Sequence, residues 1–282
     1  MNINVGNSNR VYWDRTAENY DRIFSETVVG RIQRDAVWHE MDKIFQPGMR
    51  ILELNCGTGI DAVHLAARGV RVVACDLSSG MIHAARQRSS AAGLDALVDF
   101  RVLATEDLNL LVGDVPFDGA FSNFSGLNCV QDISQVARDL ACLLKPSAST
   151  LLCMVGRFSP WEMAWHLAHG RPAIALHSFR RTPTTHSSEQ GAASIHYPSV
   201  RDMRRMFAPE FRLRGRKGIG VAVPPSCLES LARAVPGVVG GLAKIDRYIS
   251  HAPIFRSIGD CVLLQFERLS EEYPSGRKPS LS

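Results

Sequence analysis

The chain has 282 residues, of which 45% are hydrophobic and 21% are charged, and this predicts one domain with a substantial insertion. A net charge of +4 and a mean hydropathy of −0.04 argue against a disordered chain, a membrane protein and a protein that binds polyanions by charge alone. Residues 1–10 lack the basic start and apolar run of a secretory signal, so we expect a cytoplasmic protein.

The first predicted element is a helical segment over residues 12–46, where apolar residues recur near a 3.6-residue period until Pro47 and Gly48. Short apolar runs then alternate with helical stretches. This alternation predicts a doubly wound α/β fold, with a mostly parallel, seven-stranded sheet and helices on both faces. The strands expected in this part are Arg50–Leu54, Val70–Cys75, Val98–Leu103, Phe117–Phe121 and Thr150–Val155, and the helices are Gly59–Ala67, Ser79–Ala92 and Ile133–Leu144.

After residue 156 the alternation stops, and we expect residues 157–198 to form an insertion over one edge of the sheet. It follows an N-terminal helical cap (1–46) and a cofactor-binding core (47–156). Residues 199–269 are expected to complete the sheet with a helical insert, and residues 270–282 to form a disordered tail. The elements predicted after residue 156 are helices over Trp161–His169 and Ser199–Phe207, strands over Phe211–Val223 and Val262–Phe266, and helical structure over Leu228–Ile258.

The cysteines and histidines carry no metal-binding pattern. Seven cysteines, an odd number, lie mostly inside apolar runs without a C-x-x-C pair, so we expect buried, reduced thiols. The nine histidines lack the spacing that metal ligation requires, and no metal site is predicted.

The most informative segment is the strand that ends at Leu54 and runs into Asn55-Cys56-Gly57-Thr58-Gly59. Glycine lets a ligand approach the backbone closely, and the start of the next helix offers free N–H groups. Asp76 ends the following strand, where a carboxylate can accept both hydroxyls of a ribose. Each feature alone is also explained as a turn or a helix cap. Together they favour a ligand that contains a nucleoside.

The order of several motifs narrows the ligand. The glycine loop resembles the acidic-x-x-x-G-x-G motif of class I, Rossmann-like S-adenosylmethionine-dependent methyltransferases, with Glu53 as the acid. Segment 74–81 is similar to the family's second motif, in which the acid holds the ribose and the next apolar residue packs on adenine. Segments 104–108 and 116–123 resemble the loop that borders adenine and the strand whose end faces the methyl group, and 13–21 is similar to a helix that covers the cofactor.

This resemblance implies a methyltransferase that binds S-adenosylmethionine and releases S-adenosylhomocysteine. The residues that it implies for cofactor binding are Tyr12, Tyr20, Glu53, Asn55, Gly57, Thr58, Gly59, Asp76, Leu77, Met81, Thr105, Glu106, Asp107, Asn123 and Phe124. The pattern G-x-G-x-x-A at residues 57–62 also fits a dinucleotide site, which leaves a nicotinamide oxidoreductase as an alternative.

Two positions depart from the family's pattern. Asn55 stands where a glycine is usual, although Asn tolerates a positive φ better than most residues. Ala104 stands where an aspartate often receives the adenine amino group, which leaves that task to backbone groups near Thr105 or to the side chains of Glu106 and Asp107.

The chemistry of transfer does not require a dedicated catalytic residue, because positioning and exclusion of water do much of the catalysis at a sulfonium. A base is useful for a hydroxyl or ammonium acceptor, and His166, His169, His196 and Tyr197 are candidates, each of which is also explained as a surface or packing residue. Candidate residues for binding the acceptor are Asn128, Trp161, His196 and Tyr197.

A basic run over residues 212–217 raises the question of nucleic acid. Alternation along a strand places Arg212, Arg214 and Arg216 on one face, where they either hold phosphate or are solvated. The segment after the fourth strand lacks the Asn/Asp-Pro-Pro-aromatic sequence of enzymes that methylate DNA bases. Nucleic acid and membrane are therefore not the expected partners.

The leading hypothesis is methyl transfer to an oxygen or nitrogen of a small molecule, with residues 156–258, which contain no family motif, as the acceptor wall. An RNA methyltransferase and a catalytically inactive, cofactor-binding interaction protein are the alternatives, and the oligomeric state is left open. The N-terminal helix is predicted to be a lid that closes over the cofactor, with Tyr20 near the sulfonium. A helix packed permanently by Ile23 and Phe24 is the other interpretation.

Overall fold

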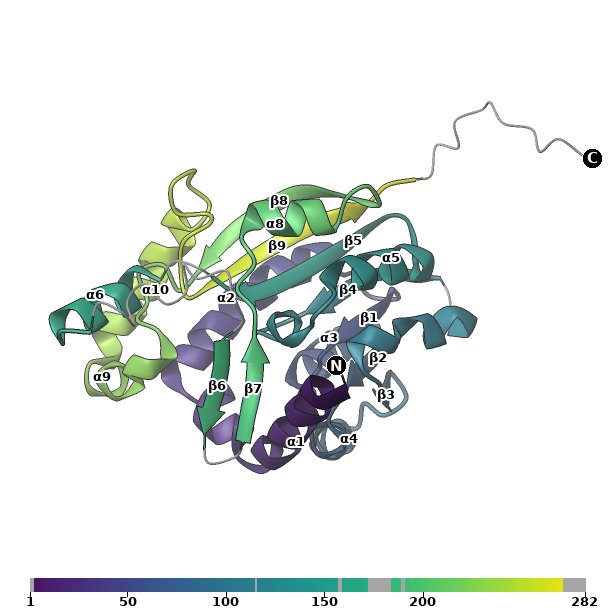
Figure 1. The fold of residues 1–282 in the computed structure, drawn as a ribbon, viewed down its shortest axis with the longest axis horizontal. Helices are drawn as coiled ribbons and strands as arrows, with labels where there is room; N and C mark the ends of the chain where they lie inside the picture. Colours follow the sequence, from purple (N-terminus) through teal and green to yellow (C-terminus); the bar gives the residue numbers. More distant parts are fainter. Residues whose placement is uncertain (1–2, 115, 157–158, 172–183, 189–190, 271–282) are drawn as a thin grey trace, which may run out of the picture.

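The computed structural model describes residues 3–114, 116–156, 159–171, 184–188 and 191–270 (Figure 1). Seven strands form one sheet in the order β3-β2-β1-β4-β5-β9-β8. β9 runs antiparallel to both of its neighbours, and the strands from β1 to β5 pair in parallel. The strands are β1 (Arg50–Leu54), β2 (Arg71–Asp76), β3 (Val98–Val102), β4 (Phe117–Ser122), β5 (Leu144–Val155), β8 (Phe211–Ile219) and β9 (Cys261–Arg268). The predicted α/β class and mostly parallel sheet are confirmed.

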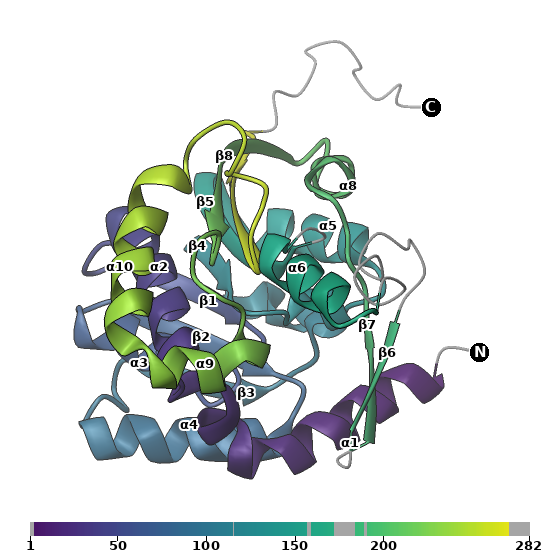
Figure 2. The ribbon, with the colours of Figure 1, turned by 90° about the vertical axis from the view of Figure 1, so that its left-hand side faces the viewer.

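Helices cover both faces of the sheet (Figures 1 and 2). Successive strand residues point to opposite faces, so Ile51 packs toward α2 and α3 while Leu52 and Leu54 pack toward α5. Both faces are therefore apolar, as expected for parallel strands. The first face carries α2 (Val28–Ile44), α3 (Ile60–Ala67) and α4 (Ser79–Ala92), and the second carries the 3-10 segment η2 (Thr105–Asp114), α5 (Ile133–Leu143) and α8 (Val200–Met206).

The segment predicted to be helical, residues 12–46, is helical but consists of two helices. α1 (Ile3–Tyr20) continues into a π-helical turn, Asp21–Ser25, before α2 begins. Thr27 starts α2 as its N-cap, and its side chain accepts a hydrogen bond from the Gly30 N–H at 2.9 Å. A side-chain oxygen that satisfies a free N–H of the first turn favours a helix start at this position.

The insertion contains α6 (Pro160–Ala168) and a hairpin of β6 (Thr184–Ser188) and β7 (Gly191–Ile195). The hairpin lies along α1 (Figures 1 and 2), whereas the edge strands of the main sheet are β3 and β8. The prediction missed the hairpin, because its Thr, Ser and Ala residues show no apolar alternation. The expected disordered tail lies almost wholly outside the described residues.

The last third of the chain also differs from the expected elements. The helical structure predicted over Leu228–Ile258 consists of the 3-10 turn η5 (Ser226–Leu228), α9 (Glu229–Ala234) and α10 (Pro236–Ile249). Pro236 separates the two helices, since proline fits the first turn of a helix but not its interior. Residues 250–258 form turns. The long strand predicted to Val223 ends at Ile219.

A β-bulge in β8 corrects the expectation for the basic run. The pairing shifts between Leu213, opposite Phe266, and Gly215, opposite Gln265, so that Arg214 is an extra residue. The shift reverses the alternation that placed three arginines on one face. Arg214 pairs with Glu267 at 2.7 Å, the buried Lys217 pairs with Glu40 on α2 at 2.8 Å, and Arg216 lies opposite Leu264, on the face that α8 covers.

Among the helices of the described residues, none has both the length and the apolar content needed to cross a bilayer. The six cysteines whose side chains are described are free. Four of these six are buried, as predicted, but Cys142 is exposed on α5.

Candidate functional site

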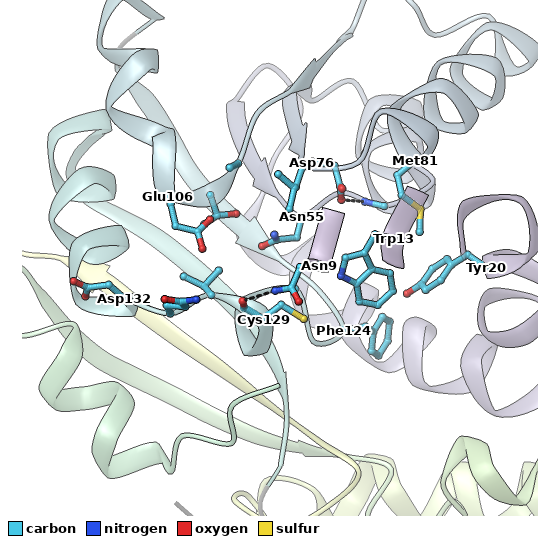
Figure 3. Close-up of a pocket in the computed structure, with 17 residues that line it drawn as sticks. Asn9, Trp13, Tyr20, Asn55, Asp76, Met81, Glu106, Phe124, Cys129 and Asp132 are labelled. Carbon is cyan, nitrogen blue, oxygen red and sulfur yellow. Dashed lines mark hydrogen bonds between the residues drawn. The ribbon is translucent and has the colours of Figure 1, made fainter. Parts of the chain in front are cut away.

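A cavity of about 440 Å³ lies where β1, β2, β3 and β4 end, beneath α1 (Figure 3). Its size is within the usual range for small-molecule sites, and the ends of parallel strands are where open α/β sheets bind ligands. Trp13, Tyr20 and Phe124 gather at one end, and Glu106 and Asp132 lie at the other (Figure 3). The cavity therefore has an aromatic end and an acidic end.

The loop after β1 owes its shape to three residues with left-handed backbone. Asn55, Gly57 and Gly59 have φ values of 53°, 54° and 74°. The expectation that Asn55 tolerates a positive φ is confirmed. Gly59 has no alternative, because a Cβ there would lie 2.7 Å from the Ala85 Cβ. The tight turn brings the backbone of Asn55 and Gly57 to the cavity wall.

Asp76 is the central polar group of the cavity. Its carboxylate accepts hydrogen bonds from the backbone N–H groups of Gly57 and Ser78, both at 2.9 Å. Burial raises the pKa of Asp76 to about 6, and these two hydrogen bonds only partly oppose that rise. Each carboxylate oxygen has room for a further donor, so Asp76 can accept two hydroxyl groups from a ligand.

Glu53 lies beneath the loop and does not line the cavity. It is 1% exposed, and its Oε2 has no hydrogen-bond partner. Burial raises the pKa of Glu53 well above its usual value, and the neighbouring Asp61 raises it further. Asp61 is bound by Arg34 at 2.6 Å and by the Trp38 and Asn123 side chains at 2.7 and 3.0 Å. Glu53 thus borders a buried polar network at the aromatic end.

α1 is fastened over the cavity at three points. Asn9 donates to the Cys129 carbonyl at 3.2 Å (Figure 3). It also accepts from the Ser194 N–H on β7 at 3.1 Å. Asp14 accepts from the Ser78 hydroxyl at 2.6 Å and the Gly80 N–H at 3.0 Å, at the start of α4. Next to the last turn of α1, Asp21 accepts from the Thr58 hydroxyl at 2.7 Å.

A cluster of aromatic side chains closes one end of the cavity. Trp13 meets Tyr20 edge-on with ring centroids 6.2 Å apart, and Phe24 contacts both Tyr20 and Phe124. Burial raises the pKa of Tyr20 to about 12, so its hydroxyl stays protonated. Trp13 also hydrogen-bonds the Cys129 thiol, whose pKa burial raises to about 12. Neutral groups therefore line this end.

The structure brings nine of the fifteen predicted cofactor residues to the cavity: Tyr20, Asn55, Gly57, Asp76, Leu77, Met81, Thr105, Glu106 and Phe124. Thr58 and Asn123 line a pocket of about 30 Å³ beside the aromatic end. Tyr12, Glu53, Gly59 and Asp107 line neither. Tyr12 is half-buried against Trp13. Gly59 shapes the loop after β1, and Asp107 lies in the segment after β3.

The candidate acceptor residues lie outside the cavity wall. Asn128 is fully buried, donates to the His196 carbonyl at 2.7 Å and accepts from the Val155 N–H at 3.0 Å. Trp161 donates to the Ala222 carbonyl at 2.9 Å, which joins α6 to the segment after β8. His196 and Tyr197 follow β7 and are half-buried. These contacts give Asn128 and Trp161 a structural role.

Eight cavity residues were not among the candidates: Asn9, Trp13, Ala104, Gly126, Cys129, Val130, Gln131 and Asp132. Trp13 belongs to the segment that resembles a covering helix. It lies seven residues, about two helical turns, before Tyr20, and this spacing could have identified it. Asp132 is the N-cap of α5, and its side chain accepts a hydrogen bond from the Gln135 N–H. An Asp just before a helix is a pattern that the sequence shows. Asn9 and Cys129 carry no local signal, since only the docking of α1 brings them together.

Comparison with known proteins identifies the family of the segment that carries these loops. Residues 51–147 match the family model described as "Methyltransferase domain". The chain contains a class I S-adenosylmethionine-dependent methyltransferase domain. The matched segment covers β1 to the start of β5, and hence the loops that line the cavity.

Relatives of this methyltransferase domain differ in their acceptors. The chain is 29% identical over 144 residues to a demethylmenaquinone methyltransferase of Corynebacterium kroppenstedtii, covering 50% of this chain and 57% of the relative. It is 30% identical over 100 residues to the tRNA 5-carboxymethoxyuridine methyltransferase of Escherichia coli K12, covering 34% and 38%. The chain thus spans only about half of the curated relatives' length.

Among solved structures, the DhpI–SAH complex superposes with a TM-score of 0.60 at 16% identity, covering 95% of this chain and 99% of the other. At this identity the likeness concerns the fold. Because the superposition covers 95% of this chain, the likeness in fold extends beyond the matched segment.

The residues of the methyltransferase cavity fit the family's cofactor. Asp76 offers carboxylate oxygens for a ribose, and Leu77 offers an apolar side chain beside it. Glu106, whose pKa burial raises, lies at the far end, where its side chain can accept a hydrogen bond from an amino group such as that of adenine. The tight backbone at Asn55 and Gly57 leaves room for the amino-acid part.

Proposed function

We propose that the protein transfers the methyl group of S-adenosylmethionine to an oxygen or nitrogen atom of a small-molecule acceptor. The observation that carries this proposal is the covered cavity, in which the buried Asp76 faces inward between two glycine-rich or polar loops. A nucleoside cofactor accounts for the free acceptor capacity of Asp76 and for the aromatic end.

In this proposal, Asp76 holds the ribose, Leu77 and Met81 border the adenine, and backbone groups near Thr105 with Glu106 read its edge. Asn55, Gly57 and Tyr20 border the amino-acid part. The bound cofactor supplies an electrophilic methyl group on a positively charged sulfur. Trp13, Tyr20 and Phe124 line the aromatic end of the cavity, and their rings exclude water from it.

Acceptor binding is assigned to the side of the cavity that the insertion borders. Asn9 lines the cavity and binds both Cys129 and the backbone of β7, so the hairpin lies next to this side of the cavity. His196 follows β7, and burial lowers its pKa, which keeps its imidazole neutral and able to accept a proton. His196 is therefore the proposed base for an acceptor that must lose one.

A small acceptor is favoured over RNA by the charge of the site. Glu106, Asp132 and Asp76 line the cavity, and carboxylates repel a phosphate backbone. Two arginines of the basic run that suggested RNA are otherwise placed, one in an ion pair and one under α8. The tRNA methyltransferase among the relatives keeps RNA as the second candidate.

Two measurements test the proposal. Calorimetry with S-adenosylhomocysteine should give saturable binding. In Asp76→Ala this binding should weaken about 100-fold, because the two hydrogen bonds that the ribose hydroxyls donate to a charged carboxylate are lost. Asp139→Ala, which removes an exposed carboxylate on α5, is the matched control and should bind normally.

Transfer of label from methyl-tritiated S-adenosylmethionine then separates the candidates. Hydroxyl and amine metabolites should accept label, and total RNA should not. Label in RNA, with binding that weakens steeply as salt is added, would replace the first candidate by the second. Cofactor binding without transfer to either pool would leave an inactive binding protein.

A further inference from the structure

A second cavity, of about 260 Å³, lies between α8 and the sheet, on the face opposite α2. Met154 of β5, Met203 of α8, and Val262 and Leu264 of β9 give it an apolar floor. Arg201, Arg216 and Ser257 line it as well. The methyltransferase family match ends at residue 147, before every residue of this cavity.

The polar side of this cavity is strongly basic. The β8 bulge turns Arg216 toward α8, and the charges of Arg256 and Arg204 reach it there. Burial lowers the pKa of Arg216, and these two neighbouring cations lower it further. Within the described part of the chain, no ion pair is formed by Arg201, Arg204, Arg216 or Arg256. The cluster therefore lacks a counter-charge.

One unsatisfied donor, on Ser257, lines this cavity, and a second belongs to the preceding residue, Arg256. The Ser257 hydroxyl and the Arg256 Nε are buried and have no hydrogen-bond partner. A buried donor without a partner costs about 1–3 kcal/mol, so such groups persist mainly where something else satisfies them. The acid nearest in sequence, Asp202, accepts the Ser199 N–H and hydroxyl in the capping box of α8.

We propose that this cavity binds a small molecule with a phosphate group and a short apolar part. The phosphate lies against Arg216, Arg201 and the Ser257 hydroxyl, and the apolar part lies on Met154, Val262 and Leu264. A phosphate matches several guanidinium groups with two negative charges and three terminal oxygens, whereas a carboxylate offers one charge and two oxygens. The cavity volume exceeds what a bare phosphate fills.

This site stands apart from the cofactor cavity and does not depend on the proposed methyl transfer. The wall between them contains Val155, which lines the basic cavity, and Asn128, which accepts the Val155 N–H at 3.0 Å. Cys129, next to Asn128, lines the cofactor cavity. A ligand in either cavity can therefore be measured without the other.

The test is calorimetry of the full chain with three probes: n-butyl phosphate, inorganic phosphate and n-butyrate. We expect n-butyl phosphate to bind about tenfold more tightly than inorganic phosphate and n-butyrate to bind far more weakly. Equal affinity for the two phosphates would overturn the apolar half of the proposal. Equal affinity for n-butyrate and n-butyl phosphate would overturn the phosphate half.

Variants locate the binding. Arg216→Gln should weaken n-butyl phosphate binding about tenfold or more, and Ser257→Ala by a few-fold. Arg212→Gln is the control, because Arg212 is exposed on the same strand and away from this cavity. Unchanged affinity in Arg216→Gln would overturn the proposal. If circular dichroism shows that this variant is unfolded, Arg201→Gln on the surface of α8 makes the same test.

S-adenosylhomocysteine binding is recorded for every variant. It should stay unchanged, so a loss of n-butyl phosphate binding cannot be confused with failure of the cofactor site. Conversely, a chain that binds n-butyl phosphate but no S-adenosylhomocysteine would refute the proposed function and support this second site.

Discussion

Residues 51–155 and residues 156–258 build two sides of the molecule by different means. In the first part, the cofactor cavity is shaped mostly by backbone: Asn55, Gly57 and Gly59 turn left-handed, and Asp76 is held by two N–H groups. In the described residues of the second part, contacts are made mainly by side chains such as Val223, Ala232 and Val239, and large apolar side chains such as Tyr248, 85% exposed, stand in solvent. Backbone shape tolerates little change, whereas side-chain surfaces vary freely.

The largest expected effect is at Gly59. In Gly59→Ala, the new Cβ would meet Ala85 at 2.7 Å and Phe100 at 3.0 Å, with φ still positive. We expect the free energy of unfolding to fall by about 3 kcal/mol, from backbone strain and overpacking together, measured by urea denaturation.

Gly93→Ala is the matched control for that variant. Gly93 also has a positive φ, of 68°, but nothing lies within 4 Å of an added Cβ. Its loss should be only about 1 kcal/mol, from strain alone. Equal losses in the two variants would mean that close packing around the cofactor loop contributes nothing.

The next effect is a pH dependence at Asp76. Its pKa of about 6 means that the carboxyl is mostly protonated at pH 5, while ribose hydroxyls bind the ionised form. Affinity for S-adenosylhomocysteine should therefore fall about tenfold per pH unit below 6 and level off above it. Asp76→Asn should bind weakly with a flat profile, and an unchanged slope in that variant would assign the titration elsewhere.

The same proton affects stability with a defined sign. Because the pKa of Asp76 is higher in the folded protein than in the unfolded chain, protonation stabilises the fold at low pH. That stabilisation is complete below pH 4 and is lost as the pH rises through about 6.

A smaller effect concerns α1 as a lid. Binding of S-adenosylhomocysteine should slow hydrogen exchange of residues 10–25, because closure protects their amides. Asp14→Ala removes the hydrogen bonds from Ser78 and Gly80, and with Asp14 one-third exposed we expect about a fivefold loss of affinity. Glu18→Ala, on the exposed side of α1, is the control. Equal protection with and without ligand would indicate a helix that is permanently packed.

The smallest expected effect is a gain in stability within residues 156–258, whereas the change at Gly59 is expected to lower stability. Nothing lies within 4 Å of a Cβ added at Gly241 inside α10, so Gly241→Ala should raise the free energy of unfolding by about 0.5–1 kcal/mol. At Gly30, inside α2, the Cβ would lie 2.0 Å from the Phe24 carbonyl, and the same change should destabilise. A destabilised Gly241→Ala would contradict the contrast between the two parts.

The fold of residues 51–155 could be predicted from the sequence better than that of residues 156–258. The five parallel strands were readable because burial on both faces makes them apolar runs between helices, and Asp76 was readable because it ends such a run. The β6–β7 hairpin and the break at Pro236 were missed, since their sequences carry no period. Strict alternation misplaced Arg216, because a bulge adds one residue that no local pattern announces.

The candidate site shows the same limit. Tyr20, Asn55 and Gly57 belong to motifs with a fixed spacing, and the structure places them on the cavity wall. Glu53 belongs to the same motif but lies beneath it, because Arg34 and Asp61 from other elements gather there. Asn9 and Cys129 are 120 residues apart and meet only when α1 docks.

The two hydrogen bonds of the Asn9 side chain have a consequence for how α1 can move. One side chain joins the covering helix to the Cys129 carbonyl on the cofactor side and to Ser194 on the hairpin side. A rotation that lifts the first turns of α1 breaks both hydrogen bonds in one movement. Asn9 thus links the cover of the cavity to the hairpin, and under the proposed function the release of S-adenosylhomocysteine would loosen the hairpin as well.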